Sequence, residues 1–144
     1  MATQQHEDIA VGQLGIRWLL TGDGSEDSIS LFEFSVPSQA KVPVAHSHDG
    51  YDETIYGLEG VLTWTVAGDA NDVGVGDVLR IPRGVVHKFE NRVDLGAKAL
   101  AIITPGLLGP DYFRDIAAVL TAGPPDPAAL GEVMRRHGLT PVPD

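Results

Sequence analysis

Three histidines and one glutamate, set in two short blocks, constrain this chain more than any other feature of its sequence. The first block is His46-Ser47-His48, with Glu53 shortly after it, and the second block contains His87. Successive side chains on a β-strand point to opposite faces, so His46 and His48 face the same way if they lie on a strand. The spacing therefore predicts a strand that presents two imidazoles to one side.

The donor atoms of these four side chains indicate one class of metal ion. Three imidazole nitrogens and one carboxylate suit iron, manganese, nickel, copper or zinc, whereas calcium and magnesium prefer all-oxygen sites. The chain has no cysteine, which excludes both a thiolate site and a disulfide scaffold. We therefore predict one divalent transition metal ion per chain, bound by His46, His48, Glu53 and His87.

The residues around these ligands resemble the two consensus motifs of the cupin superfamily. The second motif matches at all of its fixed positions, which are Gly76, Pro82, Gly84, His87 and Asn91. The first motif matches at its ligands and at Gly60 but has Ala40 where it usually begins with glycine. That glycine shapes a turn, so its absence bears on the local backbone and not on the ligands. The resemblance implies an all-β fold, the double-stranded β-helix or jelly-roll barrel of cupins, with the metal on the four ligands.

A narrower resemblance links the chain to one subgroup of these proteins. Residues 46–65, which read HSHDGYDETIYGLEGVLTWT, and the tail 110–143 are similar to small single-domain bacterial cupins described as quercetin-dioxygenase-like. Cupins of this size are usually homodimers, so the resemblance also implies a homodimer here. Members of the group share fold and metal site but act on different substrates, because a fold does not determine a function.

Turn residues and short apolar runs divide the chain into three zones of one domain. Residues 29–105 contain short runs of β-branched residues between turn signals, as expected of the cupin β-barrel. Within this zone, residues 97–104 form a nearly continuous apolar run, which predicts a strand buried on both faces. Residues 1–28 are predicted to be an N-terminal arm, with a first strand at 16–20.

The period of the apolar residues becomes helical in the third zone. Apolar side chains recur at three- and four-residue steps between Tyr112 and Leu120, and Asp126-Pro127 marks the start of a second helix. We therefore predict a C-terminal helical extension over residues 106–144 that packs on the same domain. Three roles are open to it: a lid over the pocket, a clamp in a dimer, or, most simply, a helical pair that covers one face of the barrel.

Strand parity predicts part of a substrate pocket beside the metal. The candidate pocket residues are Ile55, Val85, Phe89, Tyr51 and Trp64. The first three share a strand face with Glu53 or His87, so we expect them to point inward. Tyr51 is a candidate gate and Trp64 a candidate stacking partner, although a loop position and an ordinary core position explain them equally well. Such an apolar pocket suits a small phenolic, flavonol-like or enol substrate with oxygen atoms that reach the metal.

Three functions are consistent with this site. The first is a metal-dependent, quercetinase-like dioxygenase that uses dioxygen, with Glu53 as the catalytic base; that role of Glu53 is implied by the resemblance to flavonol-cleaving cupins. The second is a redox-neutral isomerase or lyase that uses the same metal as a Lewis acid. The third is a small-ligand-binding cupin without enzymatic activity. Substrate-dependent oxygen uptake separates the first from the second, and ligand binding without turnover indicates the third.

Charge excludes two classes of partner. The 20 acidic and 10 basic residues give a net charge of −10, which opposes binding to nucleic acid or to an anionic membrane. The polar, acidic N-terminus lacks the basic start and apolar stretch of a signal peptide, and no apolar run approaches the ~20 residues of a membrane span. We therefore expect a cytoplasmic protein whose partners are a small-molecule substrate and a second copy of the chain.

Overall fold

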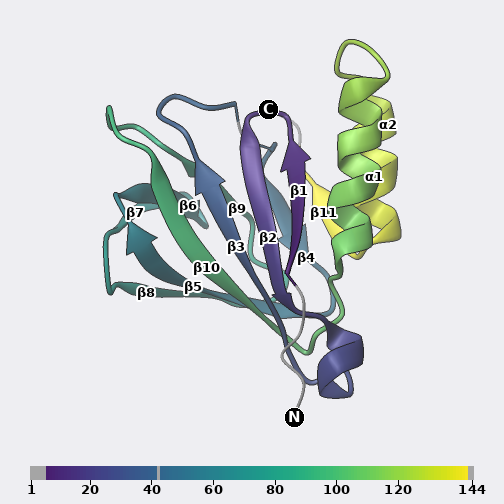
Figure 1. The fold of residues 1–144 in the computed structure, drawn as a ribbon, viewed down its shortest axis with the longest axis horizontal. Helices are drawn as coiled ribbons and strands as arrows, with labels where there is room; N and C mark the ends of the chain where they lie inside the picture. The colour runs from purple at the N-terminus through teal and green to yellow at the C-terminus, as the bar shows by residue number, and fades with distance from the viewer. Residues whose placement is uncertain (1–5, 42, 143–144) are drawn as a thin grey trace.

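A computed structural model of the chain describes residues 6–41 and 43–142, and these residues form two antiparallel β-sheets with two helices at one edge (Figure 1). The six-stranded sheet contains, in spatial order, β1 (Glu7–Val11), β2 (Leu14–Leu20), β3 (Ser30–Val36), β10 (Ala97–Thr104), β5 (Asp52–Glu59) and β8 (Val78–Ile81). The five-stranded sheet contains β11 (Leu139–Pro141), β4 (His46–His48), β9 (His87–Glu90), β6 (Leu62–Val66) and β7 (Asp69–Val73). The predicted all-β jelly-roll class with a helical extension is confirmed.

The core lies between the two sheets, because alternate residues of each strand point inward. In β3 the inward side chains are Phe32, Phe34 and Val36, each no more than 5% exposed. Phe34 of one sheet stacks on Phe89 of the other, with ring centroids 5.3 Å apart and planes 9° apart. Aromatic pairs of this kind add about 0.5–1.5 kcal/mol to the burial of their surface. The strands thus hold the two sheets together through aromatic contacts close to the predicted metal site.

The N-terminal segment 1–28, predicted as an arm, contributes two strands to the larger sheet. Strands β1 and β2 form an antiparallel hairpin, and Val11 pairs with Leu14 beside the turn. The turn residue Gly12 has a φ of +59°, which glycine adopts at little cost. Only residues 16–20 were predicted as a strand in this segment, and the structure adds β1.

Strand β10 corrects one expectation. Residues 97–104 were predicted to be buried on both faces, but burial alternates along the strand. Ala99, Ala101 and Ile103 are fully buried, whereas Leu100 and Ile102 are half-buried on the outer face. The reason is that the helices pack against β1 and β11 and leave the outer face of β10 uncovered.

The two C-terminal helices lie side by side at the edge formed by β1 and β11 (Figure 1). Helix α1 (Pro110–Thr121) begins with proline at its first position, after Gly109 as N-cap. Helix α2 (Pro127–Arg136) is capped by Asp126, whose Oδ1 accepts a hydrogen bond of 3.0 Å from the Ala128 amide. A short 3₁₀ helix, η1 (Gly22–Ser25), follows β2. No helix in the described residues is long and apolar enough to cross a bilayer.

Candidate metal centre

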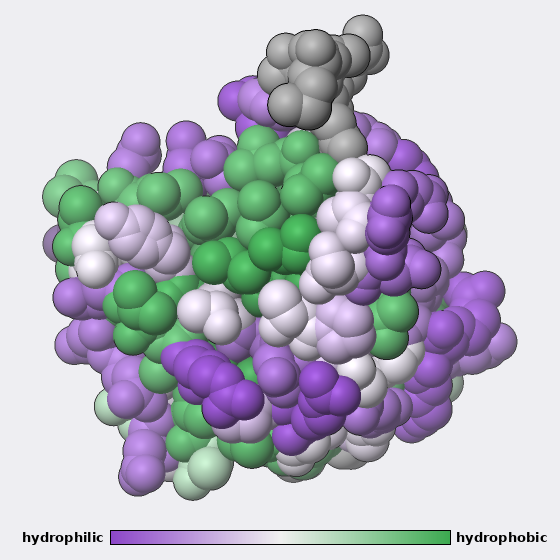
Figure 2. All heavy atoms as spheres, turned by 90° about the horizontal axis from the view of Figure 1, so that it is seen from below, coloured by the Kyte–Doolittle hydropathy of each residue, from purple (hydrophilic) through white to green (hydrophobic). Residues whose placement is uncertain are grey.

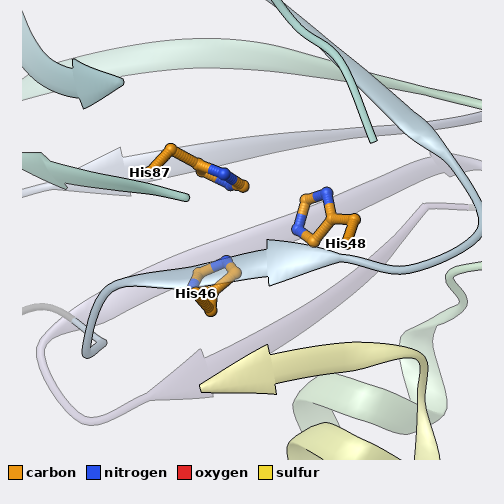
Figure 3. Close-up of side chains that lie close together, drawn as sticks. All are labelled: His46, His48 and His87. Atoms are coloured by element: carbon orange, nitrogen blue, oxygen red, sulfur yellow. The ribbon is translucent and has the colours of Figure 1, made fainter. Parts of the chain in front are cut away.

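Three imidazoles from two neighbouring strands converge inside the barrel. His46 and His48 extend from the same face of β4, and His46 pairs with His87 of β9 in the antiparallel register. One nitrogen of each ring lies within 4.8 Å of the corresponding atoms of the other two. Figure 3 shows the three rings turned toward a common space. The His-x-His spacing therefore places the side chains as the sequence analysis expected.

Backbone carbonyls orient two of these rings. The Nδ1 atom of His46 lies 2.9 Å from the Val44 carbonyl oxygen, and the Nδ1 atom of His87 lies 3.0 Å from the Val85 carbonyl oxygen. A carbonyl only accepts, so these contacts assign the proton to Nδ1 and leave Nε2 with a free lone pair. The Nε2 atom of His87 is buried and has no hydrogen-bond partner in the described residues. This arrangement fits a histidine that binds a metal through Nε2 and is held in place through Nδ1.

Glu53 reaches the same space from the opposite sheet. It lies on β5, is 6% exposed, and its Oε1 atom is 3.8 Å from Nε2 of His87. Burial raises the pKa of the Glu53 carboxyl to about 8, because the low-polarity surroundings disfavour the charged form. Without a metal ion the carboxyl is therefore mostly protonated at pH 7, and its approach to His87 is not an ion pair. A cation in this space would favour the carboxylate.

Burial also keeps the three imidazoles neutral. It lowers the pKa of His46 to about 4 and that of His48 to about 2, and the neighbouring imidazoles lower both values further. Burial lowers the pKa of His87 as well. Neutral imidazoles keep the lone pair that a metal requires. The residues present therefore fit one transition metal ion, which would bind the free Nε2 lone pair of His87 and favour the ionised form of Glu53.

The four side chains open onto an internal cavity of ≈ 60 Å³. Apolar side chains form most of its wall: Val11, Leu14, Ile16, Phe32, Phe34, Pro43, Phe89, Leu108, Phe113, Ile116 and Leu139. Pockets for drug-sized ligands are several times larger, roughly 300 Å³ or more. The cavity is partly open, and its size suits a small ligand beside a metal ion.

The predicted pocket residues lie at different depths from this cavity. Phe89 lines it. Trp64 is fully buried behind the wall, where it packs against Phe34 and Phe89, and Ile55 is fully buried in the core. Val85 lies outside strand β9, and its contribution is the carbonyl that orients His87. Strand parity separates inward from outward residues but does not give their distance from the metal along the barrel.

Tyr51 lies behind a ligand and is not among the residues that line the cavity. It is 2% exposed, and its ring stacks on His48 with centroids 4.7 Å apart. Its hydroxyl donates a hydrogen bond of 3.2 Å to the carbonyl of His137, just after α2. Strand β11 then pairs with β4, with Leu139 opposite His48. The C-terminal extension therefore braces the strand that carries two of the ligands.

Sequence reasoning missed the wall on the side of helix α1. Leu108, Tyr112, Phe113 and Ile116 line the cavity there, and the hairpin β1–β2 adds further apolar residues. The helical stripe of Tyr112, Phe113 and Ile116 was recognised as apolar, but a stripe does not identify the surface on which it packs. Of the roles considered for the extension, the structure places α1 over the cavity, and its role in a dimer stays a prediction.

Comparison with known proteins identifies the family. The cupin domain family matches residues 32–103, which is half of the 144 residues. The match contains all four candidate ligands, and the fold around them is the jelly-roll barrel described above. The chain belongs to the cupin family.

Individual relatives give narrower likenesses. A segment of 74 residues is 35% identical to a quercetin 2,3-dioxygenase of Bacillus subtilis and covers 51% of this chain but only 21% of that enzyme. A predicted oxalate decarboxylase of Thermotoga maritima has a similar structure, with a TM-score of 0.63, 21% identity, and coverage of 73% of this chain and 99% of that one. A cupin sugar phosphate isomerase of Silicibacter pomeroyi follows with a TM-score of 0.53, 26% identity, and coverage of 62% and 59%. These cupin neighbours include enzymes of several reaction types.

Proposed function

We propose that this cupin is a metal-dependent dioxygenase for a small enol or phenol. One divalent ion per chain would be held by His46, His48, Glu53 and His87. The likeness to a quercetin 2,3-dioxygenase, 35% over 74 residues, is the observation that supports the oxygenase assignment. A redox-active ion held by these four side chains would supply the oxygen chemistry that a dioxygenase requires.

The protein's own residues have three tasks in this proposal. The three neutral imidazoles hold the ion, and the carbonyls of Val44 and Val85 keep two of them in place. With the ion bound, Glu53 would be ionised and would take the proton from the substrate hydroxyl at a carboxylate oxygen, and the burial that raises its pKa in the metal-free protein also makes it a stronger base. The apolar wall excludes bulk water from the ligand.

The size of the cavity restricts the substrate class. A space of ≈ 60 Å³ accommodates a compact enol or a simple phenol far better than a flavonol. A flavonol would enter only if α1 moved away from the barrel, because α1 forms one wall of the space. We therefore expect small enols to be better substrates than flavonols.

A redox-neutral isomerase or lyase is the second candidate, and one observation favours it. The cupin sugar phosphate isomerase of Silicibacter pomeroyi is 26% identical over 62% of this chain. The same metal would act there as a Lewis acid toward a carbonyl oxygen.

The first experiment measures metal content and oxygen uptake in the same samples. Wild-type protein, His48→Ala and the control His6→Ala would be loaded with Fe(II), Mn(II), Ni(II), Cu(II) or Zn(II), because His6 is an exposed histidine outside the cluster. We expect one ion per chain in the wild type and in His6→Ala and little in His48→Ala, with oxygen uptake dependent on a simple enol. Bound metal with substrate turnover but without oxygen uptake favours the isomerase or lyase. Absence of metal in the wild type contradicts both and leaves a ligand-binding cupin.

The homodimer and the cytoplasmic location also remain proposals. Apolar side chains that support a subunit contact stay exposed on the larger sheet, such as Val78 of the edge strand β8. Figure 2 shows a broad apolar area between hydrophilic groups on the face seen from below. Patches of this kind are typical of interaction surfaces. Sedimentation of the purified protein at several concentrations tests the dimer.

A further inference from the structure

One polar side chain beyond the four candidate ligands lines the cavity. Among the described residues of the wall, Tyr112 alone carries a hydroxyl, and every other lining residue outside the four ligands is apolar. Tyr112 belongs to helix α1, outside the part of the chain that matches the cupin family. The family's motifs therefore say nothing about this residue.

The position of Tyr112 is constrained on several sides. Its side chain is 5% exposed, and its ring contacts Phe113 and His137, with centroid distances of 5.0 and 5.5 Å. The Ser30 hydroxyl donates a buried hydrogen bond of 3.0 Å to the carbonyl of Leu108, just before α1. Arg114 in the same helix donates from Nε to Glu7 of β1 at 2.8 Å. These contacts hold the first turn of α1 against the barrel.

The hydroxyl of Tyr112 differs from that of the neighbouring Tyr51. Tyr51 donates to the carbonyl of His137, whereas the Tyr112 hydroxyl makes no hydrogen bond to any described residue. Burial raises the pKa of Tyr112, and the nearby Glu53 carboxylate raises it further, so the group stays a neutral donor. The hydroxyl is not among the fully buried polar atoms that lack a partner, so it keeps some accessible surface, and a ligand oxygen in the cavity would accept its hydrogen bond.

We propose that Tyr112 is a specificity-determining residue whose hydroxyl donates a hydrogen bond to an oxygen of the bound substrate. This inference rests on the proposed function, because it takes the substrate to be bound beside the metal. The site then recognises two oxygens of one small molecule, the first at the ion and the second at Tyr112. The apolar wall contacts the carbon skeleton between them. The ligand class is a compact enol, β-diketone or phenol with two oxygen atoms.

The test is a binding titration that requires no turnover. Zn(II)-loaded wild type, Tyr112→Phe and Tyr56→Phe would be titrated with acetylacetone in a calorimeter, and zinc content would be measured before and after each titration. Tyr56 is 37% exposed on the outer face of the larger sheet, so its variant controls for the loss of a tyrosine hydroxyl elsewhere. We expect Tyr112→Phe to weaken acetylacetone binding about ten-fold or more, with unchanged zinc content. Tyr56→Phe should bind as the wild type does.

The outcomes separate the two proposals. Equal dissociation constants for wild type and Tyr112→Phe, with zinc bound in both, overturn the role of Tyr112 and leave the proposed function intact. Absence of zinc from the wild type overturns the proposed metal site, and the role of Tyr112 with it. Zinc-loaded wild type that does not bind acetylacetone overturns the proposed ligand class and the role of Tyr112 together. Loss of zinc from Tyr112→Phe alone would make the residue structural and would also contradict the proposal.

Discussion

Two walls of the same cavity differ in composition and origin. The wall from β4, β9 and β5 supplies three imidazoles and a carboxyl, all buried. The wall from α1 supplies Leu108, Phe113, Ile116 and one hydroxyl, that of Tyr112. The first wall has the groups that suit a metal ion, and the second limits the room left beside it. From this comparison we predict that metal binding and ligand selection are separable in this protein.

The largest effect, a loss of metal affinity, is expected when a candidate ligand from β4, β9 or β5 is removed. Replacement of His87 by alanine removes a buried imidazole whose Nε2 atom has no protein partner in the described residues. We expect metal affinity to fall more than about 100-fold, since loss of an outer-shell partner alone typically costs 10–100-fold. A competition titration against a chelator measures this. Affinity close to that of the wild type would show that His87 is not a ligand. It would also contradict the assignment of metal binding to this side of the cavity.

Ile116→Ala tests the helix wall. Ile116 is 8% exposed and faces the cavity, so its truncation should lower the free energy of unfolding by about 2–5 kcal/mol. Metal stoichiometry should not change, and ligands larger than acetylacetone should gain affinity. Denaturant unfolding measures the stability, with Leu95→Ala as control because Leu95 is 73% exposed. Loss of the metal in Ile116→Ala would show that the two walls are not separable.

The pH dependence of metal affinity tests whether Glu53 releases a proton when the ion binds. Below its pKa of about 8, Glu53 must release a proton when it binds an ion, so affinity should rise up to ten-fold per pH unit between pH 6 and 8. Above pH 8 this rise should stop. The pKa values of His46 and His48, about 4 and 2, lie below this window, so their imidazoles contribute no slope there.

Glu53→Gln is the control for this pH dependence, because glutamine has no proton to release. Its metal affinity, corrected for the chelator's own protonation, should be nearly flat between pH 6 and 8. A slope in Glu53→Gln equal to that of the wild type would show that another group releases the proton.

The smallest effect concerns the attachment of the helix wall to the barrel. The Ser30 hydroxyl is fully buried and donates to the Leu108 carbonyl, whereas Ser38 makes a similar bond to the Val93 carbonyl at the surface. Ser30→Ala should lower the free energy of unfolding by about 1–3 kcal/mol, because the carbonyl is left buried without its donor. Ser38→Ala should cost well under 1 kcal/mol, because water replaces the lost donor. Equal losses of unfolding free energy in the two variants would show that burial does not strengthen the contribution of the Ser30 hydrogen bond.

The two walls also differ in how far they could be predicted. Spacing of two residues on a strand places His46 and His48 on one face, and a third histidine in a second motif completes the cluster. Strand parity predicts that Phe89 points inward, and it lines the cavity. Trp64 and Tyr51 were proposed as a stacking partner and a gate on residue type and position, and both lie behind lining residues. Parity is a local property, whereas depth depends on the packing of both sheets.

Local sequence determined the strands of the barrel, the starts of both helices and the set of candidate ligands, because alternation, capping and motif spacing act over a few residues. Tertiary structure alone decided that residues 7–20 extend the larger sheet, that α1 lines the cavity and that Tyr112 shares it with His87. These pairs are far apart in the chain, and their contacts arise from the burial of apolar faces against one another. The apolar face of a helix or strand shows that this face will be buried. Only the packing of the two sheets determines which surface covers it.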